Sequence, residues 1–225
     1  MKLPKEKIDE LAEVTGRSGA CGWMFDEVAA FLHAFVLMVQ PHVVIQTGHL
    51  WGKSACAILD ALRDTHFCNA VQGDAQFEAF VQGRMLKRKV PGKLISVDPG
   101  PLGVPKSDEG IEYLTKTYPG QFEFYKMPSN LFFQEHRARL KDELHGQRIL
   151  GVVDGDHTTY GCHSDLAALA DIGAQAFFVD DTEWLPELHI VCQDFAREHS
   201  FQFLNLPYLN GVGLLVSPMV MARKI

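Results

Sequence analysis

The sequence predicts an α/β protein whose doubly wound sheet is mostly parallel, has one antiparallel edge strand and follows a set of N-terminal helices. The first observation is that strand-type and helix-type segments alternate from residue 41 onward, as they do in helices packed on a mostly parallel sheet. The second is the pair Asn210-Gly211 between the last two strand-type segments, which favours a tight turn and an antiparallel hairpin. At 225 residues we expect a single domain, with a helical cap over residues 1–40 and an α/β core over residues 41–225.

The spacing of apolar residues predicts the individual elements. Two helices come first, Lys5–Val14 and Phe25–Val39, and the second is almost entirely apolar on one face. After them, short runs rich in Val, Ile and Phe predict strands, and apolar residues three and four apart predict helices. In chain order these are strand Val43–Thr47, helix Lys53–Leu62, strand Lys93–Val97, helix Glu109–Thr117, strand Phe122–Lys126, helix Leu131–Leu144, strand Ile149–Val153, helix Ser164–Ala170, strand Ala176–Val179, helix Leu185–His199, and strands Phe201–Leu206 and Val212–Val216.

Three further segments lie between these elements. The segment Arg63–Pro91 is longer than most helix-to-strand connections. Its basic run Arg84–Lys89 is typical of a solvated helix face. The segment Pro99–Pro105 is a loop rich in proline and glycine, and Gly19–Trp23, between the N-terminal helices, is a candidate lid.

Composition and charge exclude several classes of protein. A hydrophobic content of 47% with 22% charged residues is ordinary for a soluble globular chain, and a net charge of −7 argues against a nucleic-acid partner. The five cysteines show no CxxC spacing, as expected for reduced thiols. Residues 1–13 do not resemble a signal peptide, and the longest apolar stretch, Val28–Val39, is too short to span a membrane. We expect a cytoplasmic protein with no membrane or nucleic-acid partner.

Two strand-type runs end abruptly on carboxylates. Asp154 follows one, and Asp180 with Asp181 follows the next, with a helix-type segment between them. Such a βαβ unit makes the two strands parallel near neighbours, whose carboxyl ends meet at one edge of the sheet. Three carboxylates that close raise one another's pKa unless a cation neutralises them. The sequence therefore predicts an oxygen-ligated metal site for Mg²⁺, or for Mn²⁺ or Ca²⁺.

A glycine turn follows the first strand. Gly48 and Gly52 stand between that strand and the next helix, where glycine lets the backbone approach a ligand closely. The sequence Gly52-Lys53-Ser54 matches the end of a phosphate-binding P-loop. However, only three residues separate the two glycines, and those residues, His49–Trp51, are bulky. A nucleotide triphosphatase or kinase is therefore an alternative and not the first interpretation.

The next strand ends on Asp98. An acid at this point, one βαβ unit after a glycine turn, accepts hydrogen bonds from the two hydroxyls of an adenosine ribose. An aspartate at a strand end is also a common structural feature of turns. The combination of glycine turn, second-strand acid and two further acidic strand ends is more specific than any one of them.

Together these residues resemble the class I S-adenosylmethionine-dependent methyltransferases, which have a Rossmann-like fold. Within that class the chain is similar to the metal-dependent O-methyltransferases that act on catechol, caffeoyl-CoA and bacterial sugars. The most specific match is the run Asp154–His157, DGDH, with Asp165 and Leu166 downstream, which is similar to the DGDH…DL signature of the bacterial branch.

The resemblance implies a site made of three groups of residues. The expected S-adenosylmethionine ligands are Gln46, Gly48, Gly52, Ser54, Asp98, Ser129, Asn130 and Asp154. The expected ligands of the divalent metal are Asp154, Asp180 and Asp181. The expected catalytic residues are His157 and Asp156.

The chain departs from the family pattern at two positions. Gln46 stands where the family has an acid, which removes a negative charge beside the cofactor ammonium, although an amide can still accept a hydrogen bond. Thr159 stands where the bacterial branch places an aromatic residue, and Tyr160 follows it.

The resemblance implies transfer of a methyl group to the hydroxyl of a small molecule. The metal would lower the pKa of that hydroxyl, and His157 would serve as general base. In the other interpretation His157 caps the next helix or orients a metal ligand, and Asp156 is the base. Trp184 is a candidate wall of the acceptor pocket, whereas His33 and His42 are expected to serve packing or the surface.

Other functions stay open at this point. The same scaffold supports N-methylation, and Gln46 keeps open a non-catalytic cofactor-binding module. The three carboxylates argue for catalysis, because a module without chemistry has no need of mutually repelling acids. We also expect a homodimer, since one sheet face does not obviously cover the apolar side of the second helix. That side comprises Phe25, Ala29, Phe31, Leu32, Phe35, Val36 and Val39.

Overall fold

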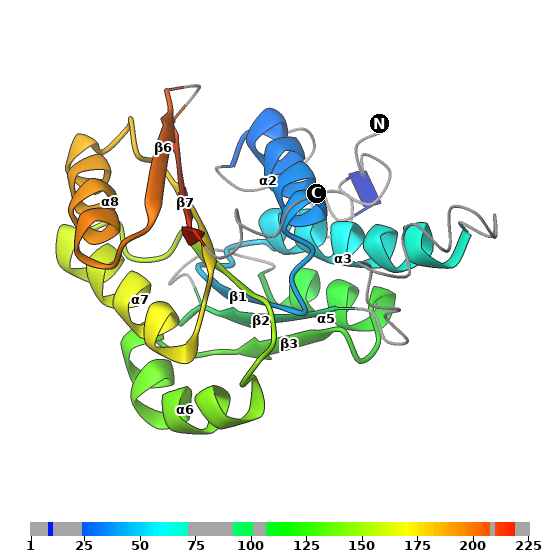
Figure 1. Ribbon diagram of the computed structural model, residues 1–225. Helices are drawn as coiled ribbons and strands as arrows, with labels where there is room; N and C mark the ends of the chain where they lie inside the picture. The colour runs from blue at the N-terminus through cyan, green and yellow to red at the C-terminus, as the bar shows by residue number, and fades with distance from the viewer. Residues whose placement is uncertain (1–8, 11–23, 72–91, 101–106, 208–209, 219–225) are drawn as a thin grey trace, which may run out of the picture.

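The structure is a computed structural model that describes residues 9–10, 24–71, 92–100, 107–207 and 210–218. Seven strands form one sheet with helices on both faces (Figure 1). The predicted lid Gly19–Trp23 and the basic run Arg84–Lys89 lie outside the described residues, as does the predicted helix Lys5–Val14 apart from residues 9 and 10, which are helical.

The observed elements follow the predicted order. They are α2 Asp26–Val39, β1 Val43–Thr47, α3 Lys53–Val71, β2 Lys93–Val97, α5 Ser107–Thr117, β3 Phe122–Tyr125, α6 Ser129–Glu143, β4 Ile149–Val153, α7 Thr159–Ile172, β5 Ala176–Asp180, α8 Pro186–Glu198, β6 Gln202–Leu206 and β7 Val212–Val216.

The sheet has the order β3-β2-β1-β4-β5-β7-β6. β1 is parallel to both β2 and β4, and β4 is parallel to β5, so the predicted βαβ neighbours are confirmed. The chain reverses direction across the sheet between β1 and β4, which makes a topological switch point at their carboxyl ends. The predicted fold class is confirmed, with one refinement: the antiparallel strand β7 lies between β5 and β6, one position in from the edge.

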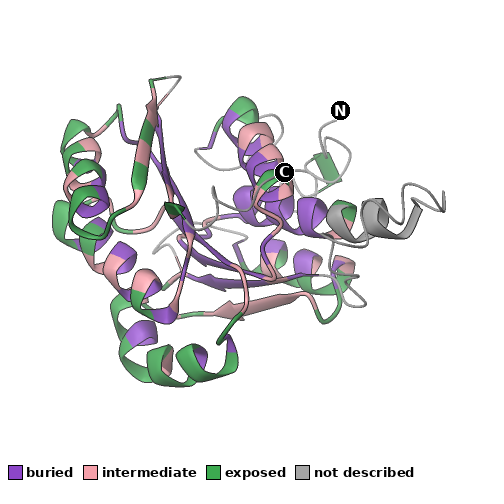
Figure 2. Ribbon diagram, in the orientation of Figure 1, coloured by how far each residue is buried: buried purple, intermediate pink, exposed green. Residues whose placement is uncertain are grey.

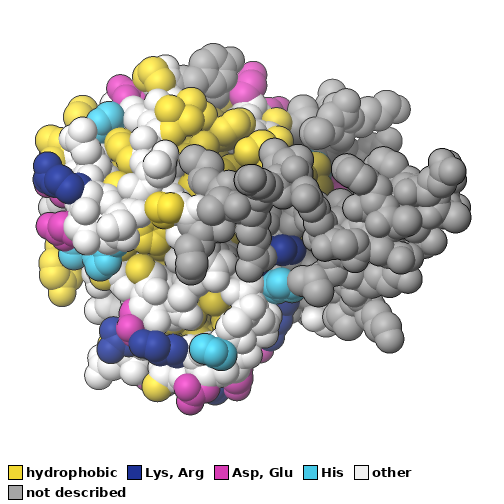
Figure 3. Space-filling model, viewed as in Figure 1, with side chains coloured by type: hydrophobic (Ala, Val, Ile, Leu, Met, Phe, Trp, Pro, Cys, Tyr) yellow, Lys and Arg dark blue, Asp and Glu magenta, His cyan; other side chains and the backbone are white. Residues whose placement is uncertain are grey.

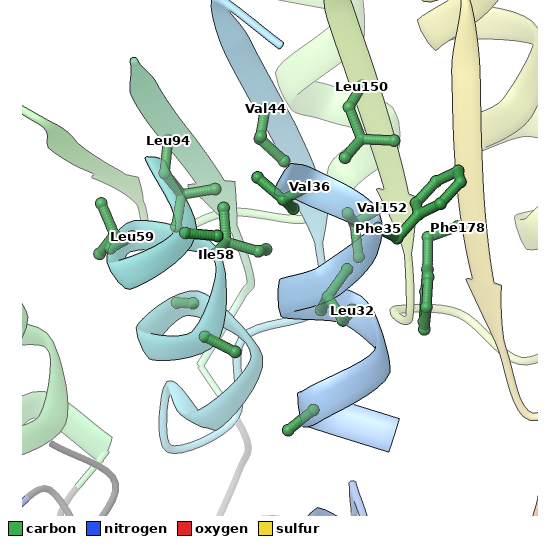
Figure 4. Packing of buried hydrophobic residues seen from close by; sticks show 14 of the residues in the cluster. Leu32, Phe35, Val36, Val44, Ile58, Leu59, Leu94, Leu150, Val152 and Phe178 are labelled. Atoms are coloured by element: carbon green, nitrogen blue, oxygen red, sulfur yellow. The ribbon is translucent and has the colours of Figure 1, made fainter. Parts of the chain in front are cut away.

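The central strands are buried on both faces. Every residue of β1, β4 and β5 is buried, which explains their continuous apolar sequences. Figure 2 shows these buried strands between helices whose outer faces are exposed. On one face α2 and α3 pack on the sheet through residues such as Leu32, Val36 and Ile58 against Val44 (Figure 4). On the other face α6, α7 and α8 form the second core.

The apolar side of α2 lies mostly inside the protein. Ala29, Leu32 and Phe35 are buried against α3 and the sheet, whereas Phe25 is 44% and Met38 75% exposed. The surface that motivated the homodimer is therefore largely covered within one chain. The homodimer stays a prediction, which light scattering at micromolar concentration would test.

Basic and acidic side chains are mixed on the surface of α6. On the face shown in Figure 3 they lie side by side over this helix, and Arg139 pairs with Glu143 and Lys141 with Asp171. The described part of this face shows no continuous basic patch of the kind that binds nucleic acids. None of the described helices is both long enough and apolar enough to cross a membrane.

Candidate active site

A cavity of about 710 Å³ opens at the carboxyl ends of β1, β2, β4 and β5. The turn after β1 and Asp98 form one side of it, and the acidic residues that follow β4 and β5 form another. This is the place where open α/β sheets bind their ligands.

The glycine turn is folded tightly against β4. Gly48 has φ +84°, and a Cβ at this position would lie 1.9 Å from the carbonyl oxygen of Asp154. Gly52 has φ +90°, and a Cβ there would lie 2.8 Å from Leu114 Cδ1. Glycine at this turn was predicted to let a ligand approach closely, but at Gly48 the close approach is first of all to the protein's own backbone.

Asp98 holds the other side of the turn. Its Oδ2 accepts hydrogen bonds from the backbone N–H groups of His49 at 2.7 Å and Leu50 at 3.1 Å, and its Oδ1 accepts one from Gly100 at 2.7 Å. Each carboxylate oxygen has about two lone pairs, so Oδ1 can accept one more hydrogen bond from a ligand hydroxyl.

Gln46 lies beneath the turn. Its Nε2 donates to the Gly48 carbonyl and to Ser54 Oγ, both at 2.6 Å. Its Oε1 is buried with no hydrogen-bond partner among the described residues. Neither Gln46 nor Gly52 lines the cavity, whereas all the other predicted site residues do.

His49, a bulky residue of the turn, has structural partners within the protein. His49 is buried with Nδ1 3.0 Å from Ser96 Oγ, and its ring packs against Phe122 and Phe124. Burial lowers the pKa of His49 to about 4, against the opposing charge of Asp98, so the ring is neutral at physiological pH.

Lys53, the first residue of α3, ties α2 to the turn. It is 4% exposed, and its Nζ donates to the Met24 carbonyl at 2.8 Å and pairs with Asp26 at 2.5 Å. Lys53 and Met24 also line the cavity. The sequence did not indicate this contact, because Lys53 is distant along the chain from Met24 and Asp26.

The acidic side of the cavity brings Asp154, Asp180 and Asp181 together. Burial and the neighbouring charges of Asp180 and Asp181 raise the pKa of Asp154 well above its usual range. Burial, and then the charge of Asp181, raise the pKa of Asp180 to about 7. The predicted convergence of the two acidic strand ends is therefore present in the structure.

The orientation of these acids adds His157 to the group. Asp180 Oδ1 accepts a hydrogen bond from the Asp181 backbone N–H at 3.0 Å. Asp154, His157 and Asp181 offer ligand atoms that all lie within 4.8 Å of one another. His157 Nδ1 is 3.2 Å from Asp181 Oδ2, and Nε2 is 3.9 Å from Asp154 Oδ1. The contact with Asp181 raises the pKa of His157, and burial opposes this effect.

Asp156 has a structural partner at the start of α7. Its Oδ1 accepts a hydrogen bond from the Thr158 backbone N–H at 2.9 Å. Its carboxyl group also lies against Gly161, where a Cβ would be 2.3 Å from Asp156 Cγ. Thr158 Oγ1 in turn accepts from Gly161 N at 3.0 Å and caps the helix. Although Asp156 lines the cavity, its carboxylate is engaged by its own loop.

The remaining predicted residues frame the cavity. Ser129 begins α6, Asn130 follows it, and both line the cavity. Trp184 is 57% exposed and makes an edge contact with His157, with the ring centroids 6.1 Å apart. His33 and His42 lie elsewhere: His33 is buried beside Asp64, and His42 Nδ1 accepts from Arg148 N.

Asp165 is a cavity residue that the predicted ligand set did not include. It is 1% exposed in α7 and lines the cavity. Burial raises the pKa of Asp165 to about 6, against an opposing effect of the Thr47 and Ser129 hydroxyls. The signal that could have found it was its place in the DGDH…DL pattern.

No protein-family model matches the chain, and no curated protein sequence matches it. Solved structures do match. The Podospora anserina methyltransferase PaMTH1, with bound SAH, is similar at a TM-score of 0.60 and 15% identity, over 94% of this chain and 88% of its own. An O-methyltransferase from Bacillus cereus in complex with SAH gives 0.60 and 10%, over 94% and 91%.

The O-methyltransferase TomG from Streptomyces achromogenes, involved in tomaymycin synthesis and solved with SAM, gives a TM-score of 0.58 at 11% identity, over 96% of this chain and 91% of its own. At these identities the likeness shows the fold. The chain therefore has the Rossmann-like fold of class I S-adenosylmethionine-dependent methyltransferases.

Proposed function

We propose that this protein is an S-adenosylmethionine-dependent, divalent-metal-assisted O-methyltransferase that acts on a hydroxyl of a small molecule. The observation that supports this best is one cavity in which the glycine turn and Asp98 face the acidic group of Asp154, His157 and Asp181. A cofactor side and a metal side thus share one space, as methyl transfer to a metal-held acceptor requires.

The residues on the cofactor side fit an adenosyl compound. Asp98 has acceptor capacity left for a ribose hydroxyl beyond its three backbone hydrogen bonds. Gln46 does not line the cavity, but it orients Ser54, the proposed ligand of the cofactor carboxylate, through a 2.6 Å hydrogen bond. Similar structures contain SAH or SAM, which supports a cofactor of this kind for the present fold.

The residues on the metal side fit a hard divalent cation. Asp154, Asp180 and Asp181 supply carboxylate oxygens, which suit Mg²⁺, Mn²⁺ or Ca²⁺. The hydrogen bond from Asp181 N engages only one oxygen of Asp180, and a carboxylate has two. Burial, and then the charges of neighbouring carboxylates, raise the pKa values of Asp154 and Asp180, and a bound cation would favour the ionised form of both groups.

His157 is the better candidate for the general base. A bound cation would supply Lewis acidity that lowers the pKa of the acceptor hydroxyl. His157 stands against Asp181, which orients the ring and raises its pKa, and so strengthens it as a proton acceptor. The Asp156 carboxylate is instead held by Thr158 and Gly161 at the start of α7. His157 therefore takes the proton, and Asp156 shapes the loop that presents it.

The P-loop alternative conflicts with the hydrogen bonding of the turn. A phosphate-binding loop presents its backbone N–H groups to the ligand. Here the N–H groups of His49 and Leu50 already donate to Asp98. A turn whose donors are engaged by a carboxylate has little capacity for a triphosphate.

A ligand panel followed by a transfer assay tests the proposal. Saturating S-adenosylhomocysteine, at about 100 times its dissociation constant, should stabilise the protein by roughly 2.7 kcal/mol, whereas ATP with Mg²⁺ and NAD should not. Labelled S-adenosylmethionine should then transfer its methyl group within a panel of phenols, catechols, sugars and amines. EDTA should abolish transfer and spare cofactor binding. Stabilisation by ATP with Mg²⁺ alone would reject the methyltransferase assignment, and transfer to amines alone would favour the N-methyltransferase.

A further inference from the structure

Acidic side chains far outnumber basic ones among the described residues that line the cavity. Lys53 is the single Lys or Arg among them, and Asp26 lies 2.5 Å from its Nζ. The ion pairs that other described Lys and Arg side chains form involve none of the cavity's acids. These acids are Asp98, Asp154, Asp156, Asp165, Asp180 and Asp181. The described lining therefore carries an excess of negative charge.

The metal and the cofactor would offset only part of this charge. The aspartates outnumber the lysine by five, whereas a divalent cation and S-adenosylmethionine, which has one net positive charge, together supply about three positive charges. A bound cation favours the ionised form of its carboxylate neighbours, so about two negative charges remain. A positively charged acceptor would reduce this excess, and an acceptor that carries a carboxylate or a phosphate would add to the repulsion.

Two exposed aromatic side chains lie beside the proposed base. Trp184 is 57% and Tyr160 81% exposed, and both line the cavity. The Trp184 ring makes an edge contact with His157 at 6.1 Å between centroids, and Tyr160 lies three residues after His157, in the first turn of α7. The face of an aromatic ring attracts a cation that lies within about 6 Å of its centroid. Both rings thus leave surface open to a positively charged group.

We propose that the acceptor is a cation, namely a small hydroxylated amine whose hydroxyl lies at His157 and whose ammonium group lies against Trp184 and Tyr160. This inference rests on the proposed function, because it specifies the acceptor of the same site. Since the centroids of Trp184 and His157 are 6.1 Å apart, the hydroxyl and the ammonium group are separated by about the width of one ring. The carboxylates supply the long-range attraction, and the two rings supply the contact.

Three catechols of similar size and different charge test this preference. At pH 7 4-(2-aminoethyl)catechol is cationic, 4-propylcatechol is neutral and 3,4-dihydroxyphenylacetate is anionic. Calorimetric titration of the protein with Mg²⁺ and S-adenosylhomocysteine should give a dissociation constant for the cation about 10-fold below that of the neutral compound, and the anion should bind most weakly. About 0.5 M NaCl should narrow these differences, because salt screens charge.

Substitution of the two rings makes the test specific. Trp184→Leu should weaken binding of the cationic catechol by about 3–30-fold and affect the neutral one less, and Tyr160→Leu should act in the same direction. Trp184→Phe keeps a ring and should retain most of the preference. Both side chains are largely exposed, so the core stays intact. Phe203→Leu is the control, because that ring lies against His189 and does not line the cavity.

The outcomes separate this inference from the proposed function. If no adenosyl compound binds, the proposed function fails and the cationic acceptor with it. If S-adenosylhomocysteine binds, the acceptor inference alone is overturned by equal binding of the three catechols, by tighter binding of the neutral or anionic one, or by binding of none of them. A loss in Trp184→Leu that is equal for all three catechols would also overturn it, because that is the result of a purely structural role.

Discussion

Asp181 is the residue at which backbone geometry and site chemistry meet. It has φ +63°, a conformation that few residues other than glycine adopt. Its backbone N–H donates to Asp180 Oδ1, and its carbonyl accepts from Leu185 N. These bonds hold the chain in this conformation, which places the Asp181 carboxylate beside His157. Strained residues of this kind are frequent at active sites.

The raised pKa of Asp180 makes stability depend on pH in a defined direction. Because its folded pKa, about 7, lies above the ordinary value of 3.8, the folded state holds a proton that the unfolded state releases. Its contribution to stability is therefore lost as pH rises from about 4 to about 7. Asp180→Asn should remove this loss and be more stable than wild type at pH 8, by up to about 4 kcal/mol.

Urea unfolding of the metal-free protein in EDTA at pH 5 and pH 8 measures this effect. The exposed Asp142→Asn serves as the control, and its pH dependence should follow wild type. Equal pH dependence in Asp180→Asn and wild type would show that this carboxyl group is not protonated in the folded state.

His157 and Asp181 should have separable roles. His157→Ala should lower the rate constant of methyl transfer by roughly 10²–10⁴ if His157 is the base, while Mn²⁺ binding measured by electron paramagnetic resonance stays within about threefold of wild type. Asp181→Ala should lose Mn²⁺ binding and turnover together, because it removes a metal ligand. A loss of Mn²⁺ binding in His157→Ala would instead show that the His157 imidazole is a metal ligand, and it would assign the base to Asp156.

At the scale of elements, the turn between β1 and α3 is the part that tolerates least change. Gly48→Ala would place a Cβ 1.9 Å from the Asp154 carbonyl oxygen in a left-handed conformation. Gly120 also has positive φ, +75°, but a Cβ there meets nothing within 4 Å. Gly120→Ala should cost about 1–2 kcal/mol for the backbone alone, and Gly48→Ala considerably more.

Thermal melts and S-adenosylhomocysteine titrations of these two variants separate strain from contact. Gly120→Ala should bind like wild type, whereas Gly48→Ala should lose binding because the turn can no longer dock on β4. Equal melting temperatures for the two variants would contradict the packing described for the turn.

The elements predicted best are those whose sequence is determined by burial. β1, β2, β4 and β7 have the predicted bounds. Short apolar runs that end at polar residues or glycine leave few alternative positions for the ends of a buried strand. The start of α7 was predicted five residues late, at Ser164, because its N-cap is Thr158 and the first turn is mostly polar. The position of β7 between β5 and β6 depends on tertiary pairing that a hairpin signal does not specify.

The same distinction applies to the site. The meeting of Asp154 with Asp180 and Asp181 follows from parallel strand order, and the sequence predicted it. The contact of His157 with Asp181 could not be predicted in this way, because the direction of the Asp181 side chain depends on the positive φ of that residue. The burial of Asp165 could not be predicted from the sequence either, because the burial of one helix position depends on how α6 and α7 pack.

For the whole molecule, the acidic side of the cavity links metal binding to stability. The chain carries a net charge of −7, and the pKa values of Asp154 and Asp180 are raised by burial and by their mutual repulsion. Protons relieve this repulsion at low pH and a divalent cation relieves it at high pH. Metal and protons should therefore compete for the same carboxylates.

Mg²⁺ should accordingly stabilise the protein more at pH 8 than at pH 6. At 100 times its dissociation constant the increase in unfolding free energy at pH 8 should be roughly 2.7 kcal/mol, because Mg²⁺ binds only the folded state, and it should shrink at pH 6, where protons occupy part of the site. Urea unfolding with and without Mg²⁺ at both pH values measures this difference. Asp154→Asn should abolish it, whereas Asp142→Asn should not. The same Mg²⁺ effect in Asp154→Asn as in wild type would place the cation elsewhere on the molecule and leave these carboxylates a structural role.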